Sequence, residues 1–223
     1  TDENGPDMEI VRKYVEHDDA VKGIWCVPVY ANPSGIVYSD ETVRAFAALK
    51  PAAKDFRIFW DNAYCIHHLT ANPKKPLTIN QACAEAGSEG MFYQFVSTSK
   101  VTFPGAGVAA MNTAKANLDE ICKHMGIQTI GFDKLNQLRH VRYFGNAENM
   151  RKHMQQHAAI LKPKFDTVLD MLEQEGYIVK FRGGAKSVRH SGDPEFNVRI
   201  GENNAGKFAI AQKAMEFLQP HSS

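Results

Sequence analysis

Lys100 stands at the end of the tetrapeptide Ser97-Thr98-Ser99-Lys100. The apolar run 92–96 precedes this tetrapeptide, and the glycine-containing turn 104–107 follows it. A run of this kind is typical of a buried strand, so the lysine is expected at the mouth of a strand, behind hydroxyl side chains. An amine in such a place can form an imine with an aldehyde, which is the chemistry of covalent lysine catalysis.

Two further polar motifs precede Lys100, and each follows an apolar run of its own. They are Asn32-Pro33-Ser34-Gly35 and Asp61-Asn62-Ala63-Tyr64. Pyridoxal phosphate needs an amine for its aldehyde, a carboxylate for its ring nitrogen, donors for its ring oxygen and donors for its phosphate. The order of the motifs predicts a pyridoxal-phosphate enzyme, with these four roles taken by Lys100, by Asp61, by Asn32 with Tyr64, and by Ser97 with Ser99.

Hydrophobic periodicity predicts strands that alternate with helices. The expected strands are 21–30, 56–60, 91–97, 177–181 and 196–200, and the expected helices are 7–17, 39–49, 78–86, 112–125, 147–175 and 207–218. Gly87 and Gly126 are expected to end two helices, and Pro163 to kink or break the long one. The pattern predicts an α/β fold with a parallel-rich sheet and helices on both faces. In such a sheet the three motifs lie together at the carboxyl ends of the strands.

Composition excludes several classes of function. The 223 residues carry a net charge of +1 with acids and bases interspersed, so we expect no nucleic-acid partner. No apolar stretch approaches the length of a membrane span, and the first residues lack a signal-peptide pattern. Four cysteines occur without C-x-x-C spacing, which favours reduced thiols and a cytoplasmic location over disulfides or zinc.

The motifs together resemble the fold type I pyridoxal-phosphate-dependent aminotransferases, and most closely their MocR-like, aspartate aminotransferase branch. The resemblance covers about residues 7–177 and returns at 193–200. The segments that carry it are Tyr30-Ala31-Asn32-Pro33-Ser34-Gly35, Trp60-Asp61-Asn62-Ala63-Tyr64-Cys65-Ile66-His67-His68-Leu69, Ser97-Thr98-Ser99-Lys100-Val101-Thr102-Phe103-Pro104-Gly105-Ala106-Gly107, Gln128-Thr129-Ile130-Gly131-Phe132-Asp133-Lys134-Leu135-Asn136-Gln137-Leu138-Arg139-His140 and Asp193-Pro194-Glu195-Phe196-Asn197-Val198-Arg199-Ile200.

The resemblance implies the reaction and the residues that carry it. A homodimer would transfer an amino group from an amino acid, aspartate, to a 2-keto acid, 2-oxoglutarate. Lys100 would serve both as covalent anchor and as proton shuttle, and Arg199 would bind the substrate carboxylate together with Asn32. The implied domains are a partial large cofactor-binding domain at 1–145, and an interdomain helix with part of a small C-terminal α+β domain at 146–223.

This chain departs from the family in two places. Many relatives carry a phosphate-binding arginine shortly after the lysine, where this chain has Gly107 and Val108. The aspartate-type branch shares that glycine. Family members are also longer and build the pocket partly from a preceding segment, so we expect this chain to contain only part of the site.

Alternative functions and sites remain open at this point. A β-lyase or decarboxylase would use the same cofactor, the effector-sensing domain of a MocR-type regulator would borrow the fold, and an inactive, structural fragment is a further alternative. His153 and His157 have the spacing of metal ligands but lack a third partner, so no metal site is predicted. His67 and His68 are expected near the cofactor. A polar cluster either reaches a partner's site or lies on the surface: Lys134, Asn136, Arg139 and Arg142.

Overall fold

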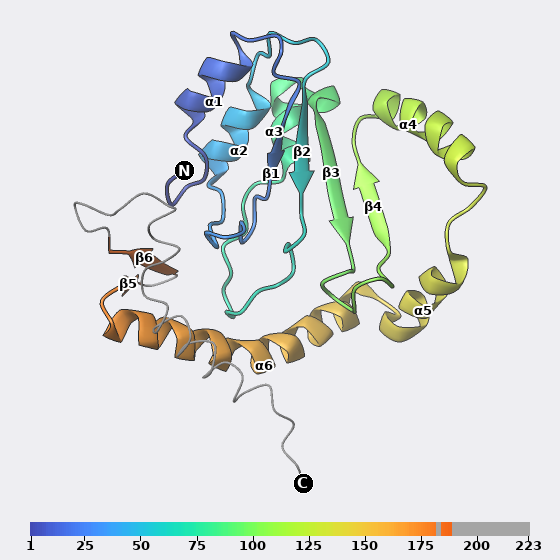
Figure 1. The fold of residues 1–223 in the computed structure, drawn as a ribbon. Helices are drawn as coiled ribbons and strands as arrows, with labels where there is room; N and C mark the ends of the chain where they lie inside the picture. Colours follow the sequence, from blue (N-terminus) through green and yellow to red (C-terminus); the bar gives the residue numbers. More distant parts are fainter. Residues whose placement is uncertain (182–183, 189–223) are drawn as a thin grey trace, which may run out of the picture. The chain divides into compact units, whose positions relative to one another are not determined.

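The computed structural model describes residues 1–181 and 184–188 (Figure 1). The chain divides into two compact units, Thr1–Met154 and Gln155–Ser223. The elements in chain order are α1 (Met8–Val15), β1 (Gly23–Cys26), α2 (Asp40–Ala47), β2 (Arg57–Asp61), α3 (Ile79–Ala86), η1 (Glu89–Met91), β3 (Phe92–Ser97), β4 (Ala109–Asn112), α4 (Lys115–Gln128), α5 (Lys134–Phe144), α6 (Ala147–Gln174), β5 (Ile178–Phe181) and β6 (Gly184–Ser187). The predicted strand at 196–200 and helix at 207–218 lie outside the described residues.

A four-stranded sheet with the order β1-β2-β3-β4 forms the first unit. Strands β1, β2 and β3 are parallel, and β4 pairs antiparallel with β3. The predicted α/β class is confirmed, with a mixed sheet. Strand β4 was not predicted. The chain returns from β3 through a short turn without an intervening helix, and such a return requires an antiparallel partner.

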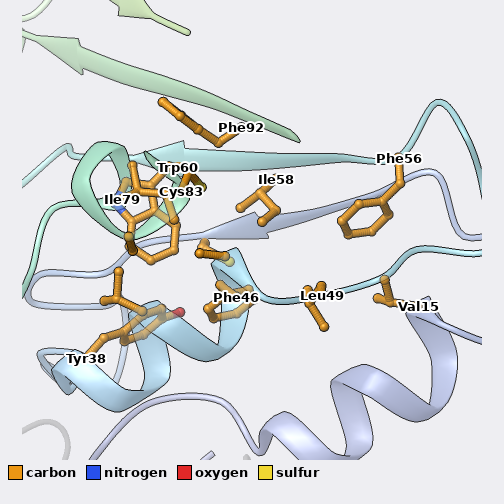
Figure 2. Packing of buried hydrophobic residues seen from close by; sticks show 14 of the residues in the cluster. Val15, Tyr38, Phe46, Leu49, Phe56, Ile58, Trp60, Ile79, Cys83 and Phe92 are labelled. Carbon is orange, nitrogen blue, oxygen red and sulfur yellow. The ribbon is translucent and has the colours of Figure 1, made fainter. Parts of the chain in front are cut away.

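One face of the sheet forms the hydrophobic core with α2 and α3. Ile58 and Trp60 of β2 point into it, together with Cys26 of β1, and all three are almost fully buried. Figure 2 shows Phe46 on the side of α2 that faces the sheet. The Phe46 ring stacks on Tyr38 at 6.1 Å between centroids and meets Trp60 edge-to-face at 5.7 Å. Close packing of large apolar side chains therefore holds this layer together.

The opposite face of the sheet carries a row of aromatic rings. Trp25, Phe59 and Phe95 come from three neighbouring strands and stack in parallel, with centroids 5.4 Å apart for the first pair and 6.3 Å for the second. Trp25 is 62% exposed. The helices of the described residues therefore leave this face uncovered at Trp25.

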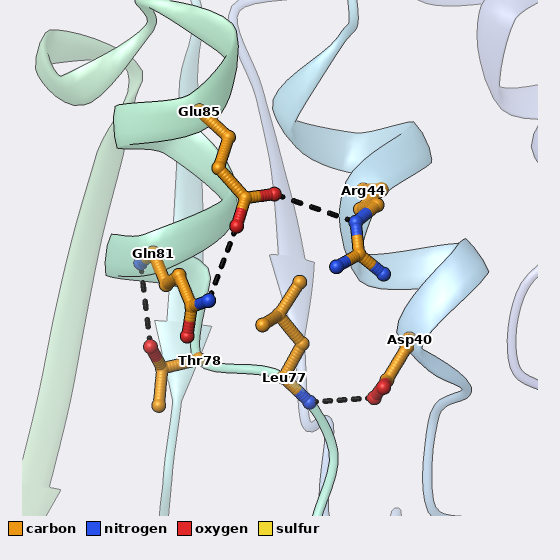
Figure 3. Close-up of polar contacts among 6 residues, drawn as sticks. All are labelled: Asp40, Arg44, Leu77, Thr78, Gln81 and Glu85. Atoms are coloured by element: carbon orange, nitrogen blue, oxygen red, sulfur yellow. Dashed lines mark hydrogen bonds and ion pairs between the residues drawn. The ribbon is translucent and has the colours of Figure 1, made fainter.

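Polar side chains begin the helices of the core layer and tie them together (Figure 3). Ser39 caps α2 and Thr78 caps α3, each by accepting a hydrogen bond from the backbone N–H three residues on. Asp40 also accepts from the Leu77 N–H at 2.7 Å. The ion pair between Arg44 and Glu85 is about half exposed, so its contribution to stability is small.

Helix ends test two predictions about glycine. Gly87 ends α3 with a left-handed conformation at φ 68°, as predicted. Gly126 does not end α4, which continues to Gln128. One interior glycine costs a helix only about 1 kcal/mol, so the helix tolerates it. Helix α6 is continuous through Pro163, so of the two predicted alternatives the break into two helices is wrong, and the kink stays a prediction.

Two strands also differ from their predicted extents. Strand β1 ends at Cys26 rather than near Tyr30. After this strand, Tyr30 adopts the left-handed conformation (φ 53°). The chain then doubles back, and the Tyr38 N–H donates to the Pro28 carbonyl. In the second unit, β5 pairs antiparallel with β6, which the sequence did not predict. No helix in the described part of the chain combines the length and apolar composition that a membrane crossing requires.

Candidate active site

The three predicted motifs lie after the carboxyl ends of β1, β2 and β3. Asp61 is the last residue of β2, and Ser97 is the last residue of β3. Asp61 is opposite Phe95 in the parallel register, and the next backbone N–H, that of Asn62, donates to the Phe95 carbonyl at 2.9 Å. Because β2 and β3 are parallel neighbours, their polar ends meet at one edge of the sheet, as predicted.

Lys100 and Tyr64 are in direct contact at this edge. The Lys100 Nζ lies 3.8 Å from the centroid of the Tyr64 ring, within the range of a cation–π contact. The Lys100 side chain is exposed and Tyr64 is half-buried. The tyrosine of the second motif therefore supports the amine of the third, although 36 residues separate them in the sequence.

Hydroxyl groups and a close approach of the backbone shape the lysine turn. The Ser97 Oγ accepts from the Ser99 N–H at 3.4 Å. Gly107 lies against Ser99, so that a Cβ at position 107 would clash with the Ser99 hydroxyl and come within 3.0 Å of its backbone nitrogen. A side chain at position 107 would therefore require the Ser99 hydroxyl to turn away and the neighbouring backbone to shift slightly.

The asparagine turn is joined to the Asp61 segment by a pair of half-buried side chains. The Tyr30 hydroxyl lies 3.0 Å from His68 Nδ1. Burial raises the pKa of Tyr30, and burial, followed by the positive charges of Lys75 and His67, lowers the pKa of His68. Both effects favour a neutral pair in which the tyrosine hydroxyl donates to the imidazole. Asn32 itself lies in the exposed turn that follows Tyr30.

Side chains from other segments hold the lysine turn from outside, and the sequence did not predict these contacts. Asn136 of α5 is 8% exposed, and its amide donates to the carbonyls of Ala106 and Gly107 at 2.8 and 3.3 Å. The imidazoles of His67, His140 and His153 contact Lys100, Thr98 and Val101 of the turn. The sequence placed His67 near the cofactor, paired His153 with His157 and put Asn136 in a polar cluster, but it indicated no contact of these residues with the turn.

Other predicted residues have the following places. Arg199 lies outside the described residues. Lys134 and Arg139 are exposed on α5, as is Arg142, whereas Asn136 of the same cluster is buried against the turn. Within the described residues, no group of three or more His, Cys, Asp and Glu side chains has the arrangement of metal ligands.

Residues 1–186 match the sequence pattern of the family described as aspartate amino-transferase. The chain belongs to this family. An aspartate aminotransferase from Corynebacterium glutamicum is 44% identical over 171 residues, which are 77% of this chain and 39% of the relative. The chain spans about two fifths of the length of the curated relatives it matches.

Solved structures of aminotransferases share the fold. The crystal structure of an aspartate transaminase from Corynebacterium glutamicum superposes with a TM-score of 0.80 and 37% identity, covering 96% of this chain and 50% of that chain. The kynurenine aminotransferase of Pyrococcus horikoshii, solved in complex with pyridoxamine phosphate (PMP), superposes with a TM-score of 0.63 at 21% identity, covering 80% of this chain and 43% of that chain. At that identity the second likeness concerns the fold alone.

Proposed function

We propose that this chain is the lysine-bearing part of a pyridoxal-phosphate-dependent aminotransferase. The reaction would move an amino group from an amino acid to a 2-keto acid, with aspartate and 2-oxoglutarate as the substrates. Membership of the aspartate amino-transferase family supports the reaction class. The observation that carries the proposal is the position of the Lys100 amine, 3.8 Å above the Tyr64 ring at the sheet edge where Asp61 ends the neighbouring strand.

The side chains at this edge fit the chemical needs of pyridoxal phosphate. Lys100 offers an exposed amine, and Asp61 offers a carboxylate at the end of the adjacent parallel strand. Ser97 and Ser99 bring two hydroxyls to the segment that carries the amine, and hydroxyl groups suit a phosphate. Tyr64 and Asn32 supply the remaining donors for a ring oxygen. When bound, the cofactor supplies a ring that takes up electrons from the α-carbon of the amino acid.

Each of these residues has a defined task in the proposed reaction. The Asp61 carboxylate holds a proton on the ring nitrogen by charge and hydrogen bonding. The Lys100 Nζ would hold the cofactor when it is bound, and the same amine could act as the general base for the α-carbon proton of the substrate. The Tyr64 ring keeps the amine at the sheet edge in both roles. Arg199 is proposed to bind the substrate carboxylate, with Asn32 as a second donor.

Finer features of the proposal follow the same resemblance. We place the protein in the MocR-like branch of the family, because the resemblance implies glycine in that branch where this chain has Gly107. We also propose a cytoplasmic homodimer, with residues 1–145 in the large domain and 146–223 in an interdomain helix and part of the small domain.

Covalent trapping at Lys100 tests the proposal. The purified chain is incubated with pyridoxal phosphate, reduced with borohydride and mapped by mass spectrometry. We expect modification at Lys100 far above that at Lys54, an exposed lysine remote in sequence. The Lys100→Arg variant, which keeps the charge, serves as the matched control and should lose the selective modification. Equal labelling of both lysines in the wild-type chain would contradict the proposal.

A product assay separates the aminotransferase from its rivals. With aspartate as donor, formation of glutamate from 2-oxoglutarate is expected of a full-length protein that contains this chain, and not of its Lys100→Arg variant. Release of ammonia or carbon dioxide from the amino acid without glutamate would instead indicate the β-lyase or decarboxylase. Cofactor trapping without any turnover would favour the effector-sensing alternative.

A further inference from the structure

The turn that carries Lys100 has little secondary structure of its own. Strand β3 ends at Ser97, and β4 begins at Ala109. Inside the turn, the N–H groups of Val101 and Thr102 both donate to the Thr98 carbonyl at 2.9 Å. These local bonds set the shape of the turn, but they do not tie it to the rest of the fold. The orientation of the Lys100 amine therefore depends on contacts from other segments.

His67 makes such a contact with Lys100 itself. Its Nε2 lies 2.9 Å from the Lys100 carbonyl oxygen. A carbonyl only accepts, so Nε2 carries the proton and donates. The same imidazole meets the Tyr64 ring edge-to-face at 5.6 Å, and the Lys100 amine lies over the Tyr64 ring. Among the described residues the other ring nitrogen of His67 is buried without a hydrogen-bond partner. One side chain thus fixes both the backbone of the lysine and the ring beneath its amine.

Two more imidazoles hold neighbouring residues of the turn. The His153 Nε2 of α6 donates to the Val101 carbonyl at 2.9 Å, and Val101 is buried. The His140 Nδ1 of α5 donates to the Asn136 carbonyl at 2.8 Å, which leaves its Nε2 to accept from the Thr98 hydroxyl at 2.9 Å. The Thr98 hydroxyl oxygen also accepts from the N–H at position 108, at 2.8 Å.

The three histidines come from separate segments: the loop after β2, helix α5 and helix α6. They contact Thr98, Lys100 and Val101, residues of one turn. We propose that His67, His140 and His153 are positioning residues that hold the Lys100 turn so that its amine stays over Tyr64. The part of this inference that concerns the amine rests on the proposed function of Lys100 as cofactor anchor. His67 has the most direct role, because it alone of the three binds the lysine residue.

Two substitutions at position 67 separate positioning from mere packing. Leucine in His67→Leu fills space but has no donor, whereas the amide of His67→Gln can still donate to the Lys100 carbonyl. His124→Leu is the matched control, because His124 is a 72% exposed histidine of α4. The first measurement is hydrogen exchange of the Val101 and Thr102 amides without cofactor. The second is the rate of borohydride trapping of pyridoxal phosphate at Lys100, with Lys54 as internal standard.

We expect His67→Leu to speed exchange at these two amides and to slow trapping at Lys100 by about tenfold, because a small misplacement of a reacting group has effects of that size or larger. His67→Gln should recover most of both values, and His124→Leu should match the wild-type chain. Unchanged exchange and trapping in His67→Leu would overturn the inference, and so would a folded His67→Gln variant that behaves like His67→Leu.

The two measurements also separate this inference from the proposed function. If the wild-type chain is not trapped selectively at Lys100, the proposed function fails. The exchange measurement then decides the histidine contacts alone: faster exchange in His67→Leu supports their role in holding the turn, and unchanged exchange overturns it.

Discussion

The core layer and the lysine turn are held together by different forces. In the core, Phe46, Ile58 and Ile79 are fully buried, and apolar contact with their neighbours supplies the stability. In the turn, Lys100 is exposed, and directional hydrogen bonds from imidazole and amide groups set the backbone. Apolar attraction has no preferred direction, whereas a hydrogen bond requires a defined distance and angle between donor and acceptor.

This difference separates stability from chemistry within one unit of the chain. The sheet and its helices create an edge where polar strand ends meet, and that edge depends on the core. The placement of one amine on the edge depends on a few polar contacts. Core substitutions are therefore expected to unfold the unit, and turn substitutions to loosen the site without unfolding it.

The largest effect is expected from Phe46→Ala. This ring is fully buried and contacts both Tyr38 and Trp60, so its removal leaves a cavity and should lower the free energy of unfolding by about 3–5 kcal/mol. Urea unfolding followed by tryptophan fluorescence measures the loss. The matched control is Phe132→Ala, because Phe132 is 58% exposed, and a change below about 0.5 kcal/mol is expected there. A similar loss of unfolding free energy in both variants would contradict the claim that the buried apolar contacts supply the stability.

An intermediate effect is expected from Asn136→Ala, which removes the two hydrogen bonds to the glycine-containing turn. The loss of free energy of unfolding should be about 1–3 kcal/mol, because two half-buried carbonyls each lose a hydrogen bond. Faster amide exchange confined to residues 105–108 is the local readout. Exposed Gln137, next in the same helix, provides the control as Gln137→Ala. Loss of protection throughout the sheet would show that the turn and the core are not separate.

High pH is expected to weaken the core. Burial raises the pKa of Cys26 from 9.0 to about 12, and it also raises the pKa of Tyr38. Above pH 9 the unfolded chain releases the Cys26 proton while the folded chain keeps it, so the free energy of unfolding falls as pH rises, by up to about 1.4 kcal/mol per pH unit for this thiol.

Urea unfolding at about pH 8 and pH 10 measures that slope. Cys26→Ala should reduce the slope, and Cys122→Ala should not, because Cys122 is exposed in the folded chain. An equal slope in wild type and Cys26→Ala would contradict the assignment to Cys26.

Much of the fold could be predicted because local signals agreed with tertiary packing. Ser39 and Thr78 are cap residues and do cap α2 and α3. The ends of β2 and β3 fell where apolar runs met Asp61 and Ser97. Strand β4 was missed because Ala109-Ala110-Met111-Asn112 has no strand preference of its own, so pairing with β3 determines its conformation.

The contacts of the site were less predictable than its motifs. Lys100, Asp61 and Ser97 could be found because each follows an apolar run. The histidine contacts join residues 33 to 52 positions apart. Two of them depend on where α5 and α6 lie relative to the turn. No local pattern encodes such a distance. The close approach of Gly107 to Ser99 likewise joins residues that no local pattern brings together.

The central claim is that Lys100 is the cofactor anchor, and the visible absorbance of the protein with pyridoxal phosphate tests it most directly. After removal of free cofactor, the wild-type chain should keep an absorbance band characteristic of protein-bound pyridoxal phosphate. The Lys100→Ala variant should lose that band while its urea unfolding stays within about 0.5 kcal/mol of wild type, because the lysine is exposed. An identical band in a folded Lys100→Ala protein would contradict the claim.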